Sequence, residues 1–222
     1  MNAPLFANIV FDTFLHGGII MWPLLVISVL AVAVVGERIA WWTASRKARD
    51  QARLTSVYAE LANGEREDAF KLAYGSRDPR LRVIAYALEH PETTTEIATQ
   101  VSISEELKGA QRFLGAMDTI VTLAPLLGLL GTVTGIMQSF RFVGGDQDLA
   151  VSKVSGGIGE ALIATSVGLG IAIFTLIPFN TFGGKAEKLE AELDTTANNL
   201  LLLAEKAKAK ANANEEGALA AR

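Results

Sequence analysis

The sequence predicts an all-α integral membrane protein with three transmembrane helices, in which spans two and three extend into a cytoplasmic helical region. Half of the 222 residues are apolar, yet a fifth are charged, and the two kinds are segregated along the chain. Uncharged or nearly uncharged apolar runs lie within residues 17–42, 119–140 and 158–180. Each is long enough for a helix to cross a bilayer core of about 30 Å.

The first span is the most apolar of the three. Residues 17–36 carry no charge, and Trp22 and the pair Trp41 and Trp42 mark its two ends, as in interfacial aromatic belts. A cleaved signal peptide is the rival interpretation. No Lys or Arg precedes Glu37, and no small-x-small cleavage site follows the apolar run, which favours a retained span.

Basic residues predict the orientation of the spans. They are absent before span one and frequent after it, before span two and after span three. The loop at 141–157 contains only Arg141 and Lys153. By the positive-inside rule, the N-terminal segment 1–16 and this loop are periplasmic, and the remaining regions 43–118 and 181–222 are cytoplasmic.

The regions outside the spans are expected to be mainly helical. Residues 2–15 suit a short interfacial helix or a disordered terminus. Helix breaks are expected at 63–64, 75–76, 78–79 and 90–91, and a helix from 93 to 111 should run into span two. After span three, apolar residues recur every three or four positions and predict a helix that packs on another helix: Ala186, Leu189, Leu193, Thr196, Leu200 and Leu203. From Lys206 the composition predicts a frayed or disordered tail.

Spans two and three each present a face of small residues. The members assigned to close helix packing are Gly128, Gly131, Gly135, Ala161, Ala164 and Gly168. Thr132 and Thr165 lie on the same faces, and their spacing from the span ends predicts the same depth, about 11 Å from the outer boundary. They either line a polar seam or satisfy their hydroxyls within their own helices.

Glu160 is the only ionisable side chain within the apolar runs 17–36, 119–140 and 158–179. A charge in a transmembrane helix is costly, and it indicates an ion path or a buried partner. The alternative is that Glu160 lies close enough to the interface to be solvated. Since threonine hydroxyls do not titrate usefully, a proton path would need a carboxylate from another chain.

Two stretches resemble the ExbB/TolQ/MotA proton-channel family. The first is APLLGLLGTVTGIM at 124–137, followed by Phe140, and the second is IGEALIAT at 158–165, followed by Gly168-Leu169 and Pro178-Phe179-Asn180. Together they cover residues 120–180. The chain has one span before the cytoplasmic region rather than two, and in this it resembles the ExbB/TolQ branch. The sequence of the first stretch is more similar to ExbB.

The resemblance implies a channel scaffold that works with other proteins. It implies a homo-oligomer, as a pentamer, around an ExbD/TolR-like single-span partner that supplies the essential aspartate. The assembly would use proton-motive force across a Gram-negative inner membrane to act on a TonB-like protein. Thr132, Thr165 and Glu160 match the family's channel residues, and Pro125 and Pro178 are assigned a conformational role.

Other function classes are disfavoured or left open. A TolQ-like role in envelope maintenance, a non-conducting scaffold and sodium in place of protons all remain alternatives. A secondary transporter usually needs internal repeats, for which three spans leave little room. With no cysteine and two distant histidines, no metal site or cofactor is expected, and no motif indicates an enzyme. A net charge of −4 does not suggest nucleic-acid binding.

Overall fold

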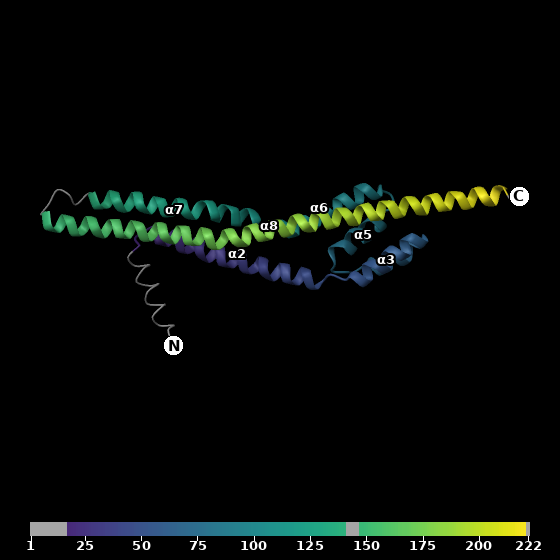
Figure 1. The fold of residues 1–222 in the computed structure, drawn as a ribbon, viewed down its shortest axis with the longest axis horizontal. Helices are drawn as coiled ribbons and strands as arrows, with labels where there is room; N and C mark the ends of the chain where they lie inside the picture. The colour runs from purple at the N-terminus through teal and green to yellow at the C-terminus, as the bar shows by residue number, and fades with distance from the viewer. Residues whose placement is uncertain (1–16, 141–146, 221–222) are drawn as a thin grey trace, which may run out of the picture. The chain divides into compact units, whose positions relative to one another are not determined.

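The computed structural model describes residues 17–140 and 147–220, which form helices and no strands (Figure 1). The elements are α2 (Met21–Lys47), α3 (Gln51–Asn63), α4 (Arg66–Ala73), α5 (Pro79–Glu89), α6 (Thr95–Gln111), α7 (Leu114–Phe140) and α8 (Gln147–Ala220). The expected interfacial helix at 2–15 lies outside the described residues. The all-helical prediction is confirmed.

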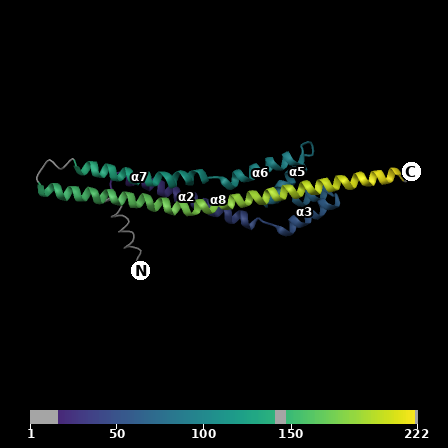
Figure 2. The same ribbon diagram turned by 45° about the horizontal axis from the view of Figure 1, so that its top comes forward.

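Three helical stretches are long and apolar enough to cross a membrane. They lie in Met21–Lys47, Thr95–Phe140 and Val154–Ala207, in agreement with the three predicted spans. Large apolar side chains such as Val29, Leu126 and Ile177 are exposed on them, as expected for surfaces that meet lipid or other helices. In both views α7 runs beside the first part of α8 (Figures 1 and 2).

The chain divides into two compact units. The membrane unit comprises Met1–Arg38 and Phe113–Phe182, and the helical unit comprises Ile39–Arg112 and Gly183–Arg222. The chain passes between them at three places, one of which lies within α8.

The helical unit forms because short amphipathic helices bury one face each. Its core includes Leu54, Val57, Leu81 and Ile84, with Leu200 from α8 packed among them. The four expected helix breaks are confirmed. Gly64 ends α3 in the left-handed conformation, where glycine avoids the steric cost of a Cβ, and Asp78 caps α5 just before Pro79.

Helix α8 is longer than the sequence indicated at both ends. It begins at Gln147 rather than near Ile158, and it continues to Ala220 through the segment expected to be frayed. Ala, Lys and Glu, which dominate that segment, have high helix propensity, and this outweighs the lack of apolar residues. The apolar stripe from Ala186 to Leu203 packs as predicted, since Ala186, Leu189, Leu193 and Leu200 are buried.

A break separates α6 from α7, where one continuous helix was expected. Phe113 has a φ of 64°, a left-handed conformation that is uncommon for an aromatic residue and stops the helical hydrogen-bond pattern. The guanidinium of Arg38 lies 5.6 Å from the centre of the Phe113 ring and also pairs with Glu37 at 2.5 Å. Because Arg38 is fully buried, this contact fixes the start of α7 against the end of the first span within the membrane unit.

Candidate functional site

Small residues bring α7 and α8 into close contact within the membrane unit. A Cβ added to Gly128 would lie 2.9 Å from the Cα of Thr165, and one added to Gly131 would lie 2.7 Å from the Cβ of Ala164. A Cβ on Gly168 would lie 2.5 Å from the carbonyl oxygen of Ala124. Since real Cβ contacts of this kind are not tolerated, these glycines allow the backbones to approach each other.

The contacts define an antiparallel register. Gly128 lies opposite Thr165, and Gly135 lies opposite the turn from Gly157 to Ala161, where an added Cβ would be 3.0 Å from both the Gly157 carbonyl oxygen and the Ala161 Cβ. Moving up α7 by one residue therefore corresponds to moving down α8 by about one residue. This register determines which side chains of the two helices share a level.

Thr165 makes a hydrogen bond between the two helices. Its hydroxyl donates to the carbonyl oxygen of Gly128 at 2.8 Å, across 37 positions of sequence. The hydroxyl of Thr132 instead donates to the carbonyl of Leu129 in its own helix, at 2.7 Å. Thr165 is therefore tied to α7, while Thr132 is satisfied locally and keeps only acceptor capacity for other groups.

The two threonines lie on neighbouring turns rather than at one depth. Thr165 is level with Gly128, which precedes Thr132 by four residues, or about 6 Å along the helix axis. The expectation of equal depth counted residues from the span ends, and it took Ile158 as the start of span three. Because α8 begins at Gln147, Ile158 is not the start of a helix. Residues counted from Ile158 therefore do not give the depth of Thr165.

Glu160 lies on a different side of α8 from Thr165. A Cβ added to Gly18 would lie 2.7 Å from the Cδ of Glu160, so this carboxylate rests against the chain just before α2. Gly18 has a φ of 74°, a conformation that favours glycine. Five residues separate Glu160 from Thr165, which places them about 140° apart around the helix.

Helix α2 covers the Glu160 side of the α7–α8 pair. Its residues Met21, Leu24 and Ile27 share a buried cluster with Ala124 of α7 and Ile171 of α8. Thr132 and Thr165 do not belong to this cluster, and both remain partly exposed within the chain. We call the surface that these two threonines share the threonine face; it is not the face on which α2 packs.

Sequence reasoning missed Gly18. The signal was the Gly17-Gly18 pair directly before the first span, which was taken only as part of that span. A glycine pair at a span end marks a turn or a close approach, and here it provides the space for the Glu160 carboxylate.

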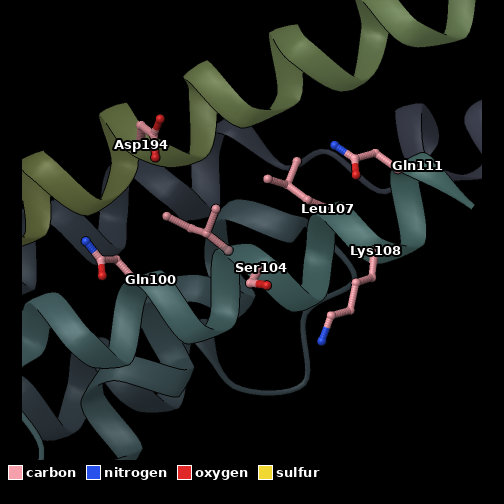
Figure 3. A pocket seen from close by; sticks show the side chains of 7 residues that line it. Gln100, Ser104, Leu107, Lys108, Gln111 and Asp194 are labelled. Atoms are coloured by element: carbon pink, nitrogen blue, oxygen red, sulfur yellow. The ribbon is translucent and has the colours of Figure 1, made fainter.

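The pockets of the helical unit are weaker candidates for a functional site than the α7–α8 contact of the membrane unit. One of about 290 Å³ lies between α6 and α8 and is lined by Gln100, Ser104, Lys108 and Asp194, among others (Figure 3). Figure 3 shows Lys108 pointing away from α8, so that it does not converge with Asp194. Within residues 17–140 and 147–220, no group of His, Cys, Asp or Glu side chains is arranged to hold a metal ion.

Comparison with known proteins identifies the family. The sequence model of the MotA/TolQ/ExbB proton channel family matches residues 76–195, more than half of the chain. The chain belongs to this family. The matched region includes Thr132, Glu160 and Thr165, and so contains the threonine face and the carboxylate beside α2.

Individual family members support the assignment. The chain is 36% identical over 177 residues to the putative biopolymer transport protein ExbB-like 1 of Synechocystis, covering 76% of this chain and 68% of that protein. It is 32% identical over 148 residues to the biopolymer transport protein ExbB of Salmonella typhimurium, covering 67% and 57%. It is 40% identical over 101 residues to the Tol-Pal system protein TolQ of Pseudomonas aeruginosa, covering 46% and 44%.

Proposed function

We propose that this family member is the ExbB-like channel scaffold of a membrane motor that uses proton-motive force. The observation that supports this most strongly is the threonine face, where the Thr165–Gly128 hydrogen bond fixes one hydroxyl and Thr132 lies on the next turn. Both hydroxyls donate within the chain and keep acceptor lone pairs, so this face can bind water or a group of a partner helix.

The proposed mechanism needs a titratable group from a partner. Neither threonine exchanges a proton at accessible pH, and Glu160 lies beside Gly18 on the side covered by α2. The chain thus supplies hydroxyls that can orient water or bind a carboxylate. An ExbD/TolR-like single-span helix would supply the carboxylate, and the coupled motion would act on a TonB-like protein for import across an outer membrane.

The proposed assembly is a ring of identical subunits, most simply a pentamer, with the threonine faces turned inward around the partner helix. In this arrangement the N-terminus is periplasmic, the C-terminus is cytoplasmic, and the membrane is a Gram-negative inner membrane. Pro125 and Pro178 lie inside α7 and α8, where each removes a helical hydrogen bond. We assign them to local flexing of the two helices during turnover.

Proton flux in liposomes tests the proposal directly. The chain alone should assemble but conduct no more protons than empty liposomes, and adding an ExbD/TolR-like single-span partner should produce flux. Thr132→Val and Thr165→Val, which keep side-chain shape and remove the hydroxyl, should lower that flux sharply. Robust flux from the chain alone would contradict the need for a partner, and none with the partner would favour a non-conducting scaffold.

A TolQ-like role in envelope maintenance is the second candidate, because TolQ of Pseudomonas aeruginosa is among the similar proteins. Complementation separates the two roles. An ExbB-like protein should restore energised outer-membrane uptake to an exbB tolQ double-deletion strain, whereas a TolQ-like protein should restore its detergent resistance. Replacing sodium by potassium in the flux assay separates proton from sodium coupling.

A further inference from the structure

A second polar surface lies on α7, nearer its start. At about 100° per residue, Asp118, Thr122, Pro125, Leu129 and Thr132 fall within a single arc of about 80°. Asp118, Thr122 and Leu129 are exposed, and Pro125 and Thr132 are partly exposed. The residues of α7 that pack on α8 and α2, such as Ala124 and Gly128, lie on another side. We call this surface the Asp118 stripe; it joins the threonine face at Thr132.

The stripe offers hydrogen-bond acceptors along its first turns. The hydroxyl of Thr122 donates to the carbonyls of Asp118 at 3.2 Å and Thr119 at 3.0 Å, which leaves its oxygen lone pairs available. The carbonyl of Val121 loses its usual helical donor because Pro125 has no N–H. The Asp118 carboxylate, the Val121 carbonyl and the Thr122 hydroxyl thus lie within little more than one helical turn.

The stripe begins at the cytoplasmic boundary of the predicted span and continues into it. Asp118 precedes the span, where a carboxylate can meet water, and Thr122 lies about one turn further in. Asp118 is the fifth residue of α7, beyond its first turn, so interaction with the helix start contributes little to favouring a carboxylate there. That interaction also does not explain why Thr122 and the altered backbone at Pro125 follow on the same side.

The neighbouring side of α7 provides a contrast. Leu123, Leu126, Leu130 and Met137 lie roughly 60–140° from the stripe, and all are exposed and apolar. That side suits lipid or an apolar helix. Thr119 is also exposed on this side, one turn before Leu123, but from Leu123 onward the side is apolar. At the level of Thr122 the two exposed sides of α7 therefore differ in chemistry.

We propose that the Asp118 stripe lines a water-filled vestibule that attracts cations and leads from the cytoplasm to the threonine face. Asp118 is its charged group, and in a ring of subunits each copy adds one more carboxylate. The inference rests on the proposed function, which places the start of α7 on the cytoplasmic side. It adds a cation-binding entrance formed by this chain itself, in addition to the carboxylate supplied by the partner.

Thiol modification tests the vestibule, because the chain contains no cysteine. Thr122→Cys reports on the stripe, and Leu123→Cys is the matched control at the same depth on the apolar side. Leu129→Cys, about 10 Å further along the helix, is a second reporter. The assembled complex in inverted membrane vesicles is treated with a cationic trimethylammonium or an anionic sulfonate methanethiosulfonate, with rates corrected for reactivity toward a free thiol.

The vestibule predicts that Thr122→Cys reacts faster than Leu123→Cys, and that it reacts roughly fivefold faster with the cation than with the anion. Adding Asp118→Asn should remove most of that preference. Equal rates at 122 and 123, no charge preference, a preference that survives Asp118→Asn, or reaction only in vesicles of the opposite orientation would each overturn the proposal. A partner helix that seals the stripe would give the first of these results.

The proton-flux assay separates this inference from the proposed function. If Thr132→Val and Thr165→Val lower flux while the stripe shows no cation preference, the channel role stands and the vestibule fails. If flux is absent in every variant and the unmodified protein, the proposed function itself fails.

Discussion

The hydroxyl of Thr165 donates to the carbonyl of Gly128 across the α7–α8 contact, at a level where Gly128 lets the two backbones approach closely. The hydroxyl of Thr132, one turn away, donates within its own helix. Two residues that resemble each other in sequence therefore differ in structure. The Thr165 hydroxyl bonds α8 to α7, whereas the Thr132 hydroxyl bonds within α7.

This difference predicts unequal effects on stability and similar effects on activity. Thr165→Val should destabilise the detergent-solubilised oligomer by about 1 kcal/mol, since it removes an interhelical bond and leaves the Gly128 carbonyl without that donor. Thr132→Val should change stability by less than about 0.5 kcal/mol. Both should reduce motor activity. Thermal unfolding of the two variants side by side checks the first part, and equal destabilisation would contradict the assigned bonding.

Glycines of the α7–α8 contact should be far less tolerant than glycines nearby. Gly168→Ala forces a Cβ to within 2.5 Å of the Ala124 carbonyl oxygen, whereas an added Cβ on Gly170 meets nothing within 4 Å. We expect Gly168→Ala to destabilise the protein by roughly 1–3 kcal/mol through overpacking. Gly170→Ala, two residues away in the same helix, should be neutral or slightly stabilising because alanine favours helix. The midpoint of thermal unfolding distinguishes them.

If both substitutions proved neutral, α7 and α8 would have to lie further apart than the structure places them. If both proved disruptive, Gly170 would be packed against a neighbouring subunit. The second result would locate an intersubunit contact on the face of α8 that carries Gly170.

The Glu160–Gly18 contact predicts how substitutions of the carboxylate should rank. If Glu160 acts as a tie to the start of α2, Glu160→Gln should be mild, because glutamine keeps the size of the side chain, and Glu160→Ala should lower the thermal stability of the membrane unit. If Glu160 relays protons, glutamine should be nearly as damaging to flux as alanine. Its position beside Gly18, rather than beside Thr165, leads us to expect the first pattern.

Gly18→Ala provides an independent measurement of the same contact. Alanine is strained at a φ of 74°, and its Cβ would displace the Glu160 side chain. We expect a loss of stability of about 1 kcal/mol or more, and a smaller additional loss from Glu160→Ala in that background, because the two changes disrupt one contact. Additive losses would show that the two residues act separately.

Hydropathy and small-residue spacing were enough to predict the membrane unit. Uncharged runs identify the spans directly, and Gly131, Ala164 and Gly168 lie at the α7–α8 contact because close backbone approach requires small residues. The break at Phe113 could not be predicted, since a positive φ at an aromatic residue depends on a tertiary contact with Arg38. The sequence also could not show which neighbour Glu160 faces, because that depends on where α2 packs.

The last prediction concerns the helical unit, where Asp78 connects two helix starts. Its fully buried carboxylate accepts hydrogen bonds from the backbone N–H of Asp50 at 2.9 Å and from the Arg80 guanidinium at 2.7 Å. Burial acts to raise the pKa of Asp78, but the hydrogen bonds from Arg80 and Asp50 outweigh it and hold the pKa below the ordinary value of 3.8.

A depressed pKa in the folded state means that Asp78 contributes stability above pH 3.8, and that this contribution is lost as the pH falls through the lower, folded-state value. Hydrogen exchange at the Asp50 and Arg80 amides, followed in the intact protein between pH 6 and the acid limit of solubility, should therefore show helix-start opening only on acidification. Exchange rates are corrected for their intrinsic pH dependence.

Asp78→Asn should show raised opening at pH 6, with little further change on acidification, because its side chain cannot ionise. Asp78→Ala should destabilise the helical unit by about 3–5 kcal/mol, since it leaves the Arg80 guanidinium and the Asp50 N–H without their shared acceptor. Asp68→Asn is the matched control. Its carboxylate pairs with Lys71 on an exposed helix surface, where ion pairs contribute little, and it should change neither the opening nor its pH dependence.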